Sequence, residues 1–114
     1  MAVDLDDINW HDGVLRDIQV SDLGGKRQGL ELLVDLYPDT DPKSRRRRYR
    51  CVGRGLRRFI VNGDVASLVK NAKSGNVDLM TMRFTADTEI LVVLLFGGTI
   101  EAEAAKFTLT EVTS

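Results

Sequence analysis

The sequence predicts an α+β domain: a curved, mostly antiparallel sheet, or a small β-sandwich, of about six strands with one helix over about residues 64–73. Two runs carry most of this prediction. Residues 89–112 read as a long hairpin, because an apolar run ends at Gly97-Gly98 and an alternating run follows. Residues 30–36 alternate apolar and polar side chains. Consecutive strands with short connections pair antiparallel, so both runs predict strands of one sheet.

The first part of the chain predicts a lead-in and two strands. Residues 1–9 are acidic and aperiodic, which predicts a flexible lead-in to a single domain over 10–114. A strand is predicted over Val14 to Val20, with Val14, Ile18 and Val20 on one face and Leu15 on the other. The next strand has the clearest alternation. Its predicted inward residues are Leu30, Leu32, Val34 and Leu36, and its outward residues include Glu31 and Asp35.

The segment 45–61 allows two interpretations. Arg45 to Val52 reads as a third strand, and Gly53 and Gly55 would permit a bulge or a sharp bend. Residues 56–61 then either continue the strand, which we prefer, or form a helical turn.

One helix is predicted after Asn62-Gly63. Asp64 is a suitable N-cap, and apolar residues follow at helical spacing. These residues are Val65, Leu68, Val69 and Ala72. Gly75 is interpreted as a left-handed terminator of the helix.

The last strands follow the helix. Val77 to Thr85 is predicted as a strand with Met80, Met82 and Phe84 on one face. Gly97-Gly98 suits a two-residue primed turn, which needs positive φ. The alternation slips between Ala104 and Phe107, which predicts a β-bulge near Ala105-Lys106 in a strongly bent final strand.

Composition limits the class of protein. The 114 residues and 12.7 kDa suffice for one hydrophobic core. The single cysteine, Cys51, and the acidic beginning of the chain predict a reducing cytoplasm. The longest apolar run is too short for a membrane-spanning helix, so we expect no membrane partner. The charges are sorted along the chain: residues 1–44 carry a net −6, residues 45–73 a net +9 and residues 74–114 a net −4.

The only histidine, His11, precedes Asp12, and the pair is a weak candidate for a polar site. We interpret it as a turn in which both side chains hold the backbone. One histidine and one cysteine cannot form a Cys/His zinc site within one chain. No catalytic triad or nucleotide-binding glycine loop is present. The sequence therefore predicts no enzyme, no cofactor and no metal, and Cys51 is interpreted as a small core residue.

The basic segment 45–58 is the main candidate for binding. Its candidate partner-binding residues are Arg46, Arg48, Tyr49, Arg50, Arg54, Arg57 and Arg58. Arginines bind carboxylates or phosphates, and Tyr49 could stack on a base. Alternatively, the arginines pair across strands with Asp17, Glu31 and Asp35. Nucleic-acid-binding domains usually have a pI above about 9, whereas this chain has a pI of 5.8.

Four short motifs resemble a group of small uncharacterised bacterial proteins with a β-rich domain. They are Trp10-His11-Asp12-Gly13, the alternating run 30–36, Gly75-Asn76-Val77, and Gly97-Gly98-Thr99-Ile100-Glu101-Ala102. The resemblance spans roughly residues 10–109, and some members of the group look like immunity proteins of toxin systems. This chain differs in Gly13, where serine is frequent, and in its arginine run. The resemblance implies the fold and a binding role, and it carries over no catalytic residue.

The leading hypothesis is therefore a cytoplasmic protein-protein interaction module, in a narrower form an immunity-like inhibitor. The alternative from another class is a nucleic-acid-binding protein that uses segment 45–58. Self-association through an exposed edge strand is a further alternative.

Overall fold

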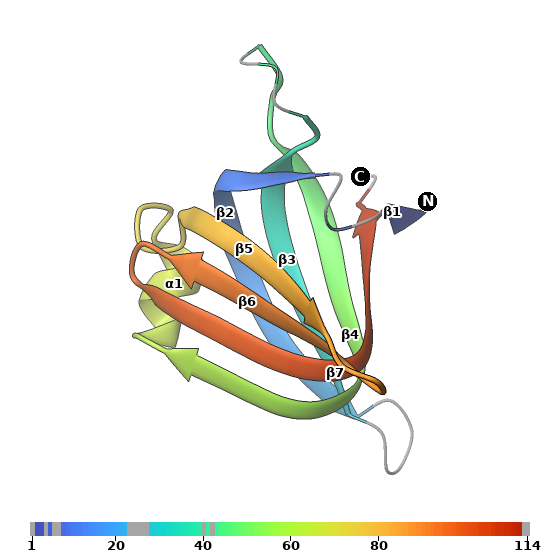
Figure 1. The fold of residues 1–114 in the computed structure, drawn as a ribbon. Helices are drawn as coiled ribbons and strands as arrows, with labels where there is room; N and C mark the ends of the chain where they lie inside the picture. The colour runs from blue at the N-terminus through green and yellow to red at the C-terminus, as the bar shows by residue number, and fades with distance from the viewer. Residues whose placement is uncertain are drawn as a thin grey trace.

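The structure is a computed structural model that describes residues 2–3, 5, 8–22, 28–39, 41 and 43–112. One antiparallel sheet curls into a half-barrel (Figure 1), with its long strands in the order β2-β3-β4-β7-β6-β5. Their bounds are β2 Asn9–Asp22, β3 Gln28–Tyr37, β4 Arg47–Asn62, β5 Val77–Phe84, β6 Glu89–Leu95 and β7 Gly98–Glu111. A two-residue β1, Ala2–Val3, pairs with β7, and the helix α1 is Val65–Lys70. The predicted curved antiparallel sheet with one helix is confirmed.

Strands β4 and β7 bend together and join the two walls of the half-barrel (Figure 1). The bend lies at Gly55, whose φ is +66°, next to Ala105 of β7. Residues 56–61 therefore continue the strand, as preferred from the sequence. The predicted break in the inward-outward alternation of β7 is confirmed, since Ala105 and Lys106 are both exposed. The irregular pairing lies in β4, however, between Leu56 and Arg58.

The core lies between the walls and receives residues from every long strand. The alternation predicted for β3 is confirmed, because its four inward residues are at most 1% exposed. The indole of Trp10 is buried, and its Nε1 donates to the carbonyl oxygen of Leu5 at 3.0 Å. Met80 and Met82 are partly buried against this core.

The faces predicted for β2 are right in one part and wrong in another. Ile18 and Val20 share a face, as predicted, because they pair with Leu32 and Leu30 of β3. Leu15 lies on this same face, opposite Val34, whereas Val14 lies opposite Asp35 on the other face. The cause is irregular pairing with β3, which shifts register between Asn9 and Val14 and again between Leu15 and Asp17. Each shift exchanges inward and outward positions.

Strands β2 and β5 meet at one end of the half-barrel and diverge at the other. Val14 forms an isolated antiparallel bridge with Asn76, and the Leu15 N–H donates to the Gly75 carbonyl at 2.9 Å. His11 Nδ1 lies 2.9 Å from the carbonyl oxygen of Asp78. Beyond Asp78, β5 pairs only with β6 among the described residues.

The helix is shorter than predicted. Asp64 is the N-cap, as expected, because its side chain accepts a hydrogen bond from the Ala66 N–H. The helix ends at Lys70, since Asn71 is extended and the following residues turn back toward β2. Gly75 is not a left-handed terminator, since it is not among the positive-φ glycines. Glycine is needed there because a Cβ would lie 2.2 Å from the Leu68 carbonyl oxygen.

The turn of the β6–β7 hairpin also differs from the prediction. Leu95 pairs with Gly98, so the turn residues are Phe96 and Gly97, and neither has positive φ. The turn is bound instead to the segment before β5: the Phe96 N–H donates to Asn76 O and the Gly97 N–H to Ser74 O, both at 2.8 Å. A Cβ on Gly98 would lie 2.0 Å from the carbonyl oxygen of Asn62. Close backbone approach therefore explains the two glycines.

The predicted lead-in, residues 1–9, is described in part. Ala2 and Val3 pair with Thr110 and Leu109 of β7, and Leu5 is 7% exposed. Met1, Asp4, Asp6 and Asp7 lie outside the described residues, as do residues 23–27, Thr40, Pro42, Thr113 and Ser114. No helix in the described part of the chain is long and apolar enough to span a membrane.

Candidate functional site

Asp35 of β3 binds one arginine of β4 and one of β2. Arg48 Nε lies 2.9 Å from Asp35 Oδ1 of β3, and Arg16 Nε of β2 lies 2.7 Å from Asp35 Oδ2. Asp35 thus links three neighbouring strands. Burial alone would raise its pKa, but hydrogen bonds and charges from Arg48 and Arg16 together hold the pKa of Asp35 below its ordinary value. The cross-strand ion pairing that the sequence suggested for segment 45–58 is therefore present between Arg48 and Asp35.

Asp35→Asn is expected to lower the free energy of unfolding by about 2 kcal/mol near neutral pH, because the charged acceptor is lost. A carboxylate with a lowered native pKa stabilises the fold above its unfolded pKa, and this stabilisation disappears as pH falls through the native pKa. Urea unfolding of both proteins from about pH 7 to about pH 2 should show the difference shrinking with acidification. Asp87→Asn, at an exposed turn residue, is the control. A difference that stays constant at acid pH would contradict the ion-pair account.

Three further arginines of β4 have acidic partners. Arg50 pairs with Glu31 of β3 at 2.5 Å, Arg47 with Glu111 of β7 at 3.4 Å, and Arg58 with Glu101 of β7 at 3.3 Å. All three arginines are about half exposed or more, so each pair contributes little to stability. Together with Arg48, these arginines are four of the eight in segment 45–58, so the ion pairs neutralise about half of the charge that the sequence concentrates there.

Two candidates from the same segment have other surroundings. Arg46 lies over the ring of Tyr37, 5.3 Å from its centroid, and its Nε donates to the carbonyl oxygen of Asp12 at 3.0 Å. Tyr49 is 3% exposed and belongs to the core. Its ring is therefore not open for the stacking contact that the sequence suggested.

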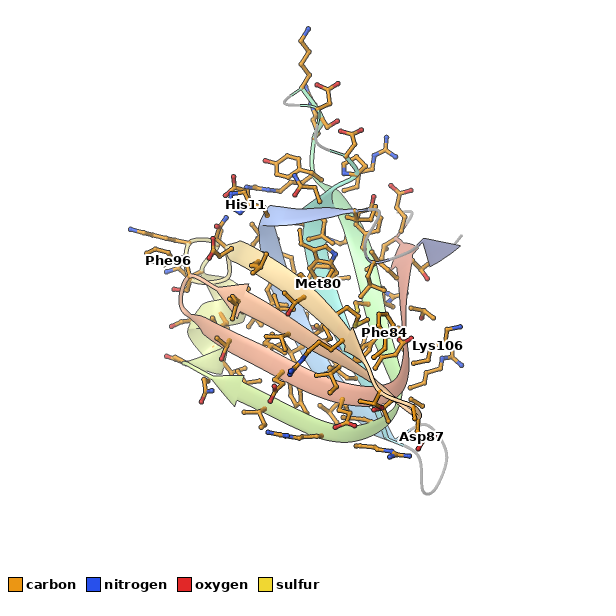
Figure 2. All side chains as sticks on the ribbon, in the orientation of Figure 1. His11, Met80, Phe84, Asp87, Phe96 and Lys106 are labelled. Carbon is orange, nitrogen blue, oxygen red and sulfur yellow. The ribbon has the colours of Figure 1, made fainter. Side chains whose placement is uncertain are left out.

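Three cations at the bend of the sheet form what we call the cationic corner: Arg54, Arg57 and Lys106. Arg54 of β4 is paired in register with Lys106 of β7, and all three side chains are exposed. Within the described part of the chain, none of the three has an acidic side chain at ion-pair distance. Figure 2 shows Lys106 projecting outward where β7 bends.

Three acidic residues of β6 and β7 have other partners. Glu101 contacts Arg58 and Arg83, Glu103 accepts a hydrogen bond from Thr88 at 2.7 Å, and Glu89 accepts one from the Phe107 N–H at 2.8 Å. The structure thus assembles a positive surface from residues of two strands. Sequence reasoning missed Lys106, because only the register of β4 on β7 brings it beside Arg54.

The His11-Asp12 pair lies at the start of β2 and is exposed. Asp12 has a φ of +64°, which is uncommon outside glycine. The hydrogen bond to the Asp78 carbonyl, and then the charge of Asp12, raise the pKa of His11. The imidazole therefore holds the backbone of β5, as the structural interpretation predicted for this side chain. The predicted turn is wrong, since both residues lie within β2, and the Asp12 carboxylate is near His11 Nε2, at 3.8 Å, instead of holding backbone. No group of three or more His, Cys, Asp and Glu side chains among the described residues is arranged to hold a metal ion.

Cys51 is buried in the core, as expected. Burial raises the pKa of its thiol to about 12. The thiol therefore stays protonated at neutral pH and is a poor nucleophile.

The comparisons with known proteins concern the fold. No family model matches the chain, and no curated protein matches its sequence. Its structure is similar to the crystal structure of an uncharacterized protein from Neisseria gonorrhoeae, with a TM-score of 0.61 at 14% sequence identity over 92% of this chain and 96% of that one. This similarity shows a shared fold with an uncharacterised bacterial protein, as the sequence resemblance implied, and assigns no family.

Proposed function

We propose that the protein is a non-enzymatic protein-protein interaction module of a bacterial cytoplasm, and that it binds an acidic surface of its partner through the cationic corner. One observation carries this proposal. Arg54 and Lys106 face each other across β4 and β7 with no described acidic partner, whereas most arginines elsewhere on β4 are paired.

The opposed pair is costly in the free protein. Like charges directly opposite each other destabilise a sheet, roughly by the 0.2–1 kcal/mol that opposite charges contribute. Carboxylates of a partner would remove this repulsion and form charge-assisted hydrogen bonds with Arg54. Such contacts speed association and favour acidic partners over basic ones.

A protein partner fits the surroundings of the corner better than a nucleic acid does. Glu101 and Glu103 project from the same strand, β7, as Lys106, so a phosphate chain that follows this strand would meet negative charge. The buried ring of Tyr49 also removes the stacking contact that sequence-tolerant nucleic-acid binding uses. The narrower form of the proposal, an immunity-like inhibitor that covers an acidic face of a toxin, draws its support from the sequence resemblance.

Capture from a lysate of the source cell tests the proposal. The immobilised protein is incubated with and without nuclease, at about 0.1 M and about 1 M salt, where the screening length falls from about 10 Å to about 3 Å. We expect one acidic protein that remains after nuclease treatment and is released at high salt. Loss of all bound material on nuclease treatment would instead support the nucleic-acid alternative. Retention that does not change with salt would exclude the cationic corner as the contact.

A further inference from the structure

The outer edge of β5 lacks the usual protection of an edge strand. From Leu79 to Phe84 it pairs only with β6 among the described residues. Natural edge strands are commonly blocked by proline, by charged side chains, by β-bulges or by a covering element. From Leu79 to Phe84 the strand has no proline and one charged residue, Arg83, and the face that carries Met80, Met82 and Phe84 has no charge. The only irregularity is a register shift at its beginning, between Val77 and Leu79.

Apolar side chains are exposed along this edge. Phe84 is 66% exposed although it shares a face with Met80 and Met82, and Leu79 on the other face is 50% exposed. Beside the start of β5 lies a pocket of about 210 Å³ whose lining includes Ile8, Trp10 and Met80. A cavity of about 150 Å³ can hold a benzene ring, so this pocket has room for an aromatic side chain.

We propose that the edge of β5 binds the same edge of a second copy of this chain, in an antiparallel pairing centred on Thr81. A two-fold axis at Thr81 places each Met80 opposite Met82 of the other copy and each Leu79 opposite Arg83. The two half-barrels then share one continuous sheet. This inference does not depend on the proposed function of the cationic corner.

The charges along β5 suit this pairing. Asp78 begins the segment and Arg83 lies near its end, and their side chains are 76% and 67% exposed. In an antiparallel arrangement the acidic end of each strand lies beside the basic end of the other. A parallel arrangement would place like charges together, so the charge pattern favours the two-fold antiparallel pair.

The position of Phe84 at the end of β5 also suits this pairing. With Thr81 opposite Thr81, Phe84 of one copy lies opposite Asp78 of the other. Asp78 is one of the residues that line the pocket. Each exposed phenyl ring can then enter the pocket of the second copy. The exposed apolar side chains at this edge are thereby covered in both copies.

Molecular mass in solution tests the pairing. Light scattering or sedimentation from about 10 µM to about 1 mM should show the mass rising toward twice 12.7 kDa. Phe84→Ser should weaken self-association about tenfold or more. Phe96→Ser is the matched control, because Phe96 is 71% exposed and follows β6, on the side of β5 away from its free edge, so it should leave association unchanged. Figure 2 shows Phe96 far from Phe84 of the same copy. A wild-type protein that stays monomeric throughout, or equal effects of both variants, would overturn the proposal.

Charge pairing at the axis tests the register. Thr81 is exposed, so Thr81→Lys and Thr81→Glu should both fold, and each alone should lose self-association because like charges meet at the axis. An equimolar mixture should restore the dimer as a Lys-Glu heterodimer. Ala72→Lys, an exposed position beyond the helix, is the control for added charge. Association that survives in both single variants would show that another surface mediates it.

Discussion

Replacing Gly75 with alanine is expected to lower the free energy of unfolding by about 3 kcal/mol. The new Cβ would lie 2.2 Å from the Leu68 carbonyl oxygen and 3.2 Å from that of Leu15. Both are backbone atoms, so no side chain can rotate away. The backbone of Gly75 is itself held, since its N–H donates to Asn71 O and its carbonyl accepts from Leu15 N–H, both at 2.9 Å.

Urea unfolding followed by the fluorescence of the single tryptophan, Trp10, measures this loss. Ala72→Ser is the control, because it adds one heavy atom at an exposed position of the same segment and should change stability by less than about 0.5 kcal/mol. If Gly75→Ala were as stable as this control, the close junction of α1, β2 and the segment before β5 would be wrong.

Replacing Leu32 with alanine is expected to cost about 3 kcal/mol, because the cavity lies in a core that cannot fully relax. Leu32 is 1% exposed. Its neighbour Leu33 points to the other face and is partly exposed, so Leu33→Ala should cost less than about 1 kcal/mol. The two variants delete the same atoms from adjacent positions of β3. Equal losses in thermal or urea unfolding would contradict the assignment of the two faces.

The sequence predicted those elements whose side-chain pattern is set by one buried face. In β3 every second residue meets the core, so the alternation from Leu30 to Leu36 could be read directly. The N-cap Asp64 could also be predicted from the sequence, because the hydrogen bond that its side chain accepts from the Ala66 N–H is local. In β2, by contrast, two register shifts exchange the faces, and the sequence alone does not show where they fall.

Gly75 and Gly98 were recognised from the sequence as structurally required, but the reason predicted for them was wrong. Gly75 and Gly98 looked like positions that need positive φ, whereas each lacks a Cβ because another backbone segment lies against it. Close approach depends on which segments meet in space, and the local sequence does not encode it. Gly55 is the opposite case, since the predicted bend is present there with positive φ.

The candidate site was predicted in part. The arginine segment was identified, and its pairing with Glu31 and Asp35 was anticipated because these acids lie on a neighbouring strand. Three things depended on tertiary structure: the burial of Tyr49, the pairing of Arg47 with Glu111, and the position of Lys106 opposite Arg54. The slip in alternation near Ala105-Lys106 was the one sequence signal for the corner, and its link to Arg54 appears only in the register.

We propose that the cationic corner, rather than the arginine-rich segment as a whole, contacts an acidic protein partner. The most direct test compares capture from the lysate by three proteins: wild type, Arg54→Ser with Lys106→Ser, and the control Lys43→Ser with Arg45→Ser. The control removes the same two charges from exposed residues before β4. We expect the corner variant to lose the partner while it unfolds no more easily than wild type, because the opposed charges are gone, and we expect the control to retain the partner. Equal retention by the corner variant and wild type would contradict the claim.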